Sequence, residues 1–134
     1  MNQYYVEVEK YCISLKCVES ETDILDYEHF KKLAPSNVTK GLVSLVTDKF
    51  EYTMLCDDDG YCKDLPVNDL VTLALANEAR TKREEQYWLQ HAIVGDVSFI
   101  ARAVSTDPDM HYLTKEQGDY LVALLKDYKR IYDL

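Results

Sequence analysis

The sequence predicts an α+β fold, in which a small antiparallel β unit built on a central hairpin precedes a mainly helical C-terminal half of about three helices. Two observations indicate it. Short β-prone runs separated by turn residues occupy the middle of the chain. From residue 68 onward the apolar residues recur at helical spacing instead. With 134 residues, no repeat and no low-complexity tract, we expect residues 1–134 to form a single compact domain with a substantial core.

Residues 3–18 match two patterns. Helical spacing connects Tyr4, Val8, Tyr11, Cys12 and Leu15, whereas strand-like alternation connects Tyr11, Ile13, Leu15 and Cys17. We favour a helix, because the residues at helical spacing form the more regular pattern and Asn2 can cap the helix. A strand is the alternative. A second, short helix is expected over residues 26–34, ended by Pro35, because the residue before a proline avoids helical geometry.

Strands are expected over residues 42–46, 50–56 and 61–65. Asp59-Gly60 lies between the last two, and such a pair is typical of a tight hairpin turn because glycine adopts positive φ without strain. This hairpin would hold Cys56 and Cys62 near each other at its base. It would also present the acidic triplet, Asp57 to Asp59, at its tip.

The C-terminal half contains the remaining helices. Asn68 is a suitable N-cap for the first of them, and the polar run 80–85 either continues this helix through solvent or interrupts it. Gly95 is suited to follow a helix end. Asp96 is then expected to cap a helix that carries Val97, Ile100, Ala101 and Val104.

The last helix has the clearest signals. Thr114 and Gln117 have the spacing of a capping box, in which each side chain bonds to the other residue's backbone. Gly118 lies just inside this helix, where a glycine costs about 1 kcal/mol relative to alanine, so we expect another backbone to pack closely there. The residues expected to face the core are Leu121, Leu124, Leu125 and Tyr128.

Charge restricts the partners of the chain. The formal net charge is −9 and the sequence pI is about 4.7, which disfavours direct binding to nucleic acid or to an anionic membrane and favours a basic protein. No segment reaches the roughly 18 apolar residues of a membrane span, and the first residues do not resemble a signal peptide. We therefore expect a cytoplasmic protein, of a bacterium or of an infected host. The sequence is compatible with a monomer or an oligomer.

Eleven tyrosines accompany three phenylalanines and one tryptophan. Tyrosine combines a large contact area with a polar tip, which suits protein interfaces, although a tyrosine-rich core edge is the alternative. The predicted partner-binding residues combine such aromatic side chains with the acidic triplet. They are Asp57, Asp58, Asp59, Tyr61, Tyr87 and Trp88.

The four cysteines allow a metal site as a second hypothesis. Cys12, Cys17, Cys56 and Cys62 form two pairs, and structural zinc is held by four such ligands. The spacings within the pairs are wider than the usual two intervening residues, so free thiols are the alternative. The acidic triplet does not match a calcium loop, because Gly60 is at its fourth position rather than its sixth.

No catalytic motif occurs in the sequence. A third hypothesis is therefore an enzyme with an unrecognised Cys–His site built from one of the four cysteines and His29, His91 or His111. The leading hypothesis is a non-enzymatic, acidic protein-interaction module without a cofactor. It would act as an inhibitor or adaptor of the phage type, which binds a basic nucleic-acid-handling protein with carboxylates in place of phosphates.

Overall fold

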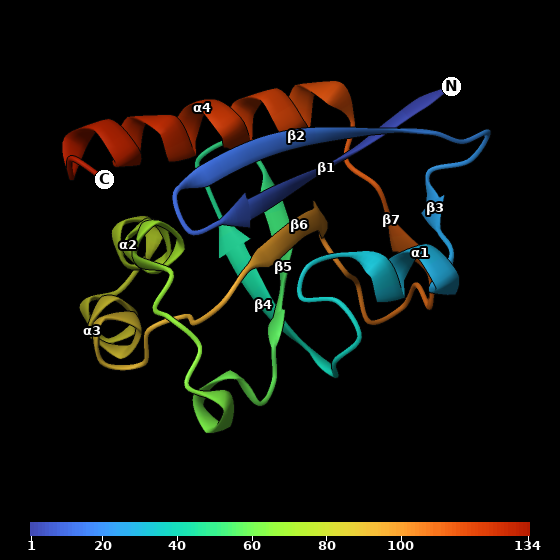
Figure 1. The fold of residues 1–134 in the computed structure, drawn as a ribbon. Helices are drawn as coiled ribbons and strands as arrows, with labels where there is room; N and C mark the ends of the chain where they lie inside the picture. Colours follow the sequence, from blue (N-terminus) through green and yellow to red (C-terminus); the bar gives the residue numbers. More distant parts are fainter.

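The computed structural model describes all residues 1–134 and confirms the α+β fold. A five-stranded antiparallel sheet has the order β2-β1-β6-β5-β4, and a separate two-stranded sheet pairs β3 with β7 (Figure 1). The strands are β1 (Asn2–Glu9), β2 (Cys12–Glu19), β3 (Ile24–Leu25), β4 (Lys40–Val46), β5 (Glu51–Asp57), β6 (Val97–Ala101) and β7 (Met110–His111). The helices are α1 (Tyr27–Lys32), the 3-10 helix η1 (Gly60–Lys63), α2 (Asp69–Glu78), α3 (Lys82–Gln90) and α4 (Lys115–Ile131).

The N-terminal segment is a β-hairpin, so the favoured helix over residues 3–18 is wrong. β1 and β2 pair along their whole length and are joined by the two-residue turn Lys10-Tyr11. The alternation of this hairpin is blurred in the sequence because its strands meet apolar side chains on both faces. Leu15 packs against the main core, whereas Val18 packs against a second cluster on the opposite face.

Residues 97–101 form a central strand, so the helix expected after Asp96 is also wrong. β6 lies between β1 and β5. Val97 and Phe99 belong to the main core, and Ile100 belongs to the second cluster. A short strand buried on both faces gives a continuous apolar run, which periodicity alone does not distinguish from a buried helix.

The main core lies between one face of the sheet and the helices α2 and α4. Figure 1 shows α4 running along β1 and β2, with α2 beside it. The capping box at Thr114 and Gln117 is confirmed. Close packing at Gly118 is confirmed, but the neighbour is a side chain and not a backbone, since a Cβ there would lie 2.5 Å from Leu15 Cδ1. Leu121 and Leu125 are fully buried, but Leu124 is only half-buried and lies outside the core, which corrects its assignment.

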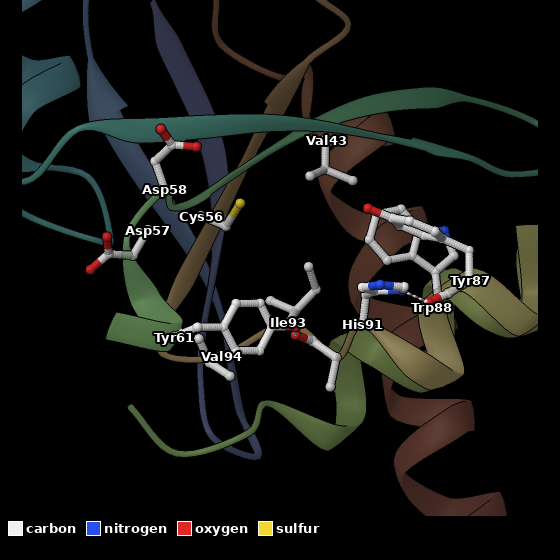
Figure 2. A pocket seen from close by; sticks show the side chains of 11 residues that line it. Val43, Cys56, Asp57, Asp58, Tyr61, Tyr87, Trp88, His91, Ile93 and Val94 are labelled. Carbon is white, nitrogen blue, oxygen red and sulfur yellow. Dashed lines mark hydrogen bonds between the residues drawn. The ribbon is translucent and has the colours of Figure 1, made fainter. Parts of the chain in front are cut away.

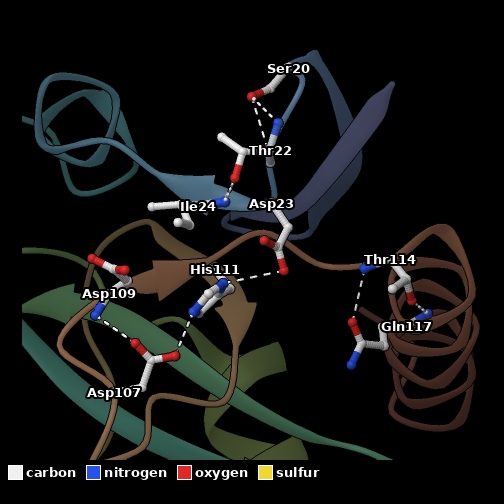
Figure 3. Close-up of polar contacts among 9 residues, drawn as sticks. All are labelled: Ser20, Thr22, Asp23, Ile24, Asp107, Asp109, His111, Thr114 and Gln117. Carbon is white, nitrogen blue, oxygen red and sulfur yellow. Dashed lines mark hydrogen bonds and ion pairs between the residues drawn. The ribbon is translucent and has the colours of Figure 1, made fainter.

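The second face of the sheet is covered by α1 and the β3–β7 pair. Its buried cluster consists of Leu25, Leu33, Leu55, Ile100 and Tyr112. Asp26 caps α1 by accepting a hydrogen bond from the His29 amide, which confirms the short helix, although it ends at Lys32. His111 in β7 lies between two carboxylates, with Nε2 2.7 Å from Asp107 and Nδ1 3.2 Å from Asp23 (Figure 3).

The strands expected over residues 42–46 and 50–56 are confirmed, but the central hairpin expected around Asp59-Gly60 is wrong. β4 and β5 pair in register, with Val46 opposite Glu51, and Thr47 closes the connecting turn by hydrogen bonds to Phe50. After β5, however, residues 60–63 form η1 rather than a strand. Gly60 is required there for close packing and not for positive φ, because a Cβ would lie 2.5 Å from Val94 Cγ2.

The polar run 80–85 contains a helix break. Asn68 caps α2 as expected, α2 ends at Glu78, and Thr81 caps the separate helix α3. Gly95 has a φ of 80°, but it lies in the segment after α3 and does not end that helix. None of the helices combines the length and apolar character needed to cross a membrane.

Candidate functional site: an aromatic and acidic pocket between β5 and α3

A pocket of about 250 Å³ lies where the end of β5 and η1 approach the C-terminal end of α3 (Figure 2). Five of the six predicted partner-binding residues line it: Asp57, Asp58, Tyr61, Tyr87 and Trp88. Asp59, the sixth, lies outside. The remaining lining residues are Val43, Cys56, His91, Ala92, Ile93 and Val94. The structure therefore brings together side chains that are up to 51 positions apart in the sequence, from Val43 to Val94.

The floor of the pocket is fixed by the start of α2. The buried Asn68 donates two hydrogen bonds to the segment 93–95. Its backbone N–H donates to the carbonyl of Ile93, and its side-chain Nδ2 donates to the carbonyl of Gly95. Thr72 Oγ1 accepts from the Ile93 amide at 2.9 Å. These bonds satisfy buried polar groups of an irregular segment, which would otherwise be costly. The segment that carries the buried side chains of Ile93 and Val94 is thereby anchored to α2.

The three carboxylates of the acidic triplet have different surroundings. The Asp57 side chain is only 4% exposed and accepts hydrogen bonds from Lys63 Nζ at 3.0 Å and from the Asp59 amide at 2.9 Å. Although removal from solvent acts to raise the pKa of Asp57, these two bonds outweigh it and the pKa is lowered. Asp57 is thus part of the local structure, which corrects the expectation that a hairpin tip presents it to a partner.

Asp58 is the carboxylate that is left available at the pocket. Its backbone amide donates to the carbonyl of Thr39, which anchors the residue. Its side chain is exposed and takes part in no hydrogen bond or ion pair. In Figure 2 it lies at the end of the pocket opposite Tyr87 and His91. A negative charge without a partner therefore lies at one end of an apolar cavity.

Aromatic side chains form the other end. The Tyr87 ring stacks on His91, with centroids 4.4 Å apart and planes at 19°, and it meets Trp88 edge-on at 4.9 Å. Tyr87 and His91 are four residues apart, so the helical spacing of α3 places them on one face. His91 Nδ1 lies 3.0 Å from the Tyr87 carbonyl, and the buried Trp88 Nε1–H has no hydrogen-bond partner.

Tyr61 closes the pocket from the side of η1. Its hydroxyl donates to the carbonyl of Ala92, which links η1 to the segment after α3. Tyr61 is still 63% exposed and Tyr87 is 50% exposed. Two large rings therefore present apolar surface to solvent at the rim of one cavity, which is the property expected of aromatic anchor residues in interfaces.

Cys56 and His91 line the same pocket, as the hypothesis of a Cys–His site requires, but their surroundings do not activate the thiol. Burial, followed by the charges of Asp58 and Asp57, raises the pKa of Cys56 above its ordinary value. Its Sγ is directed to the carbonyl of Gly41 at 3.6 Å, and His91 is bonded to Tyr87 instead. A nucleophilic cysteine needs the opposite environment, with a lowered pKa or an adjacent base.

The four cysteines do not converge on one point. Cys12 and Cys17 are five positions apart on β2, and alternation directs them to opposite faces of the sheet. β2 is one edge of the sheet, whereas Cys56 is in β5 and Cys62 in η1. All four thiols are free, and no group of three or more His, Cys, Asp or Glu side chains is placed to hold a metal ion.

The second acidic segment, residues 19–28, does not extend the acidic surface of the pocket. Figure 1 shows it beside β3 and α1, away from η1. Its carboxylates are largely engaged in local contacts: Glu19 pairs with the N-terminal ammonium, Asp23 contacts His111, and Glu28 pairs with Lys31. The acidic triplet and the carboxylates of residues 19–28 thus lie in separate regions of the molecule.

Sequence reasoning missed the contribution of Val43, Cys56, His91 and Ile93 to the pocket. The spacing of Tyr87 and His91 on one helix was the only local signal for any of them. Comparisons of the chain with protein-family models, with curated proteins and with solved structures found no match.

Proposed function

We propose that this protein is an acidic protein-interaction module that binds a basic partner protein through the pocket between β5 and α3. The observation that carries the proposal is the combination of the unpaired Asp58 carboxylate with the exposed rings of Tyr61 and Tyr87 around one cavity. Aromatic anchors supply most of the binding energy in many interfaces, and complementary charge adds specificity and speeds association.

The net charge of −9 supports a basic partner, because long-range attraction raises the rate of encounter with a positively charged surface. Proteins that handle nucleic acid carry such surfaces, and we propose this class of partner, with the chain acting as an inhibitor or adaptor. The separation of the acidic triplet from residues 19–28 favours a local contact at the pocket over an extended imitation of a phosphate backbone.

The test is capture of partners from a native lysate on the immobilised protein, quantified by mass spectrometry. The wild-type chain is compared with Tyr87→Ala and with Asp133→Asn, a control that removes one exposed carboxylate near the C-terminus, outside the pocket. We expect the wild type and Asp133→Asn to enrich the same basic proteins. Tyr87→Ala should reduce that enrichment at least about tenfold, the usual consequence of removing an anchor side chain.

Two results would contradict the proposal. One is that the enriched proteins are not basic. The other is that Tyr87→Ala retains them as well as the wild type does, which would place the binding surface elsewhere on the molecule.

A further inference from the structure

We propose that the pocket between β5 and α3 accepts the side chain of a single arginine of the partner, with its guanidinium group at Asp58. The inference rests on the proposed function and specifies what the pocket recognises. It follows from the size of the cavity, from the order of its surfaces and from the state of its carboxylates.

Size indicates a side chain rather than a cofactor. Pockets that bind small molecules usually measure about 300–1,000 Å³, whereas this cavity measures about 250 Å³ and is open to solvent. An open cavity of this size suits one long side chain that projects from another protein. A bare metal ion is disfavoured because hard cations need several oxygen ligands, and Asp58 is the only unengaged carboxylate in the lining.

The order of surfaces matches an amphipathic cation. Figure 2 shows Asp58 at one end, Tyr87 and His91 at the other, and Cys56 between them. The middle of the pocket is apolar, lined by Val43 and Ile93 as well as the protonated Cys56 thiol. Long basic side chains place their methylene groups along apolar surface and keep the charged end with polar groups. An arginine lying along the pocket satisfies both requirements.

The charges favour arginine over lysine. The guanidinium group is planar, forms two parallel hydrogen bonds to one carboxylate and is more weakly hydrated than an ammonium group. Asp58 can offer both oxygens because no other group binds them. The neighbouring Asp57 is already occupied by Lys63. Guanidinium groups also stack on aromatic faces, and the exposed ring of Tyr61 lines the same cavity.

Asp58 and Asp59 form a matched pair for the test. Both are exposed, adjacent carboxylates that form no ion pair, but only Asp58 lines the pocket. Asp58→Asn and Asp59→Asn therefore change the net charge equally and differ only in the local contact. Trp88 is the single tryptophan of the chain and lines the pocket, so intrinsic fluorescence reports its occupancy directly.

The experiment titrates each variant with N-acetyl-arginine amide and with its neutral isostere N-acetyl-citrulline amide, after circular dichroism has confirmed the fold. We expect a saturable change in Trp88 fluorescence with the arginine compound, weakened about threefold to tenfold in Asp58→Asn and unchanged in Asp59→Asn. The citrulline compound should bind more weakly to the wild type, and N-acetyl-lysine amide should lie between the two.

The inference is overturned if the signal does not saturate by about 50 mM arginine compound, because so weak a contact cannot anchor a complex. It is also overturned if both substitutions act equally, or if citrulline or lysine binds as well as arginine. The proposed function is tested separately by the capture experiment. If basic proteins are still captured in a way that depends on Tyr87, the proposed function holds in each of these cases. Loss of that capture would remove the proposed function as well.

Discussion

The two faces of the five-stranded sheet are covered in different ways. The face beneath α2 and α4 contributes to a core of 15 buried residues, which includes Leu121 and Leu125. The opposite face, beneath α1 and the β3–β7 pair, has a cluster of only five. The larger layer is held by apolar burial. The smaller one adds polar contacts at its edge, such as the hydrogen bond between His29 and Tyr112 and the two carboxylates around His111.

The difference indicates that the two layers respond to different conditions. Apolar burial is proportional to area and depends little on pH or moderate salt. Contacts that depend on a histidine and on partly exposed carboxylates change with both. The layer of α1, β3 and β7 is therefore expected to open locally at lower free energy than the helical layer. The candidate pocket is built on β5, η1 and α3, outside that small layer.

The largest loss of stability is expected for a substitution in the main core. Leu121→Ala should lower the free energy of unfolding by about 2–5 kcal/mol, because the side chain is fully buried among well-packed neighbours. Leu124→Ala, on the same helix but half-buried, should cost less than half as much. Urea titration of both variants checks this. Equal losses would mean that α4 presents a different face to the sheet.

A smaller effect is expected in the second cluster. Leu33 is as buried as Leu121, but its few neighbours can shift to fill the space, so Leu33→Ala should cost about 2 kcal/mol, near the lower limit for such changes. Hydrogen exchange should show the loss of protection confined to α1 and β3. A loss of protection that extended to α2 and α4 would show that the two layers unfold as one unit.

The smallest effect is a pH dependence of the β3–β7 pair. The hydrogen bond to Asp107 and the charge of Asp23 raise the pKa of His111, although burial acts to lower it. A histidine whose pKa is raised by folding stabilises the fold fully below its unfolded pKa, and this contribution disappears as the pH rises through the folded pKa. The amides of Met110 to Tyr112 should therefore be better protected at about pH 6.5 than at about pH 8.5, after correction for intrinsic exchange.

His111→Gln is the control for this pH dependence, because it keeps a polar side chain but does not titrate. The difference in protection between the two pH values should disappear in this variant. Its persistence would assign the pH dependence to another group, and equal protection of the wild-type chain at both pH values would remove His111 from the stability of this layer.

The successes and failures of the sequence-based predictions have a common explanation. α2 and α4 were found because their caps are local: Asn68 and Thr114 each bond to a backbone amide within three residues. α1 was found from the proline that follows it. β1 and β6 were missed because their apolar pattern depends on contacts on both faces of the sheet, which sequence neighbours do not record. β2 was missed with its partner β1. The strand predicted over residues 61–65 was wrong because Gly60 packs against Val94, a contact between residues 34 positions apart.

The sequence by itself determined the fold class, the helices capped by Asn68 and Thr114, the strands β4 and β5, and the acidic, tyrosine-rich composition. These properties follow from local hydrogen bonding, local periodicity and net charge. Only the tertiary structure decided which free carboxylate lies at the pocket. Asp57, Asp58 and Asp59 are identical in sequence terms, and Lys63, the Asp59 amide and the position of the α3 end distinguish them. The reason is physical: the environment of a charge is set by groups brought near it through folding, and residue identity does not specify that environment.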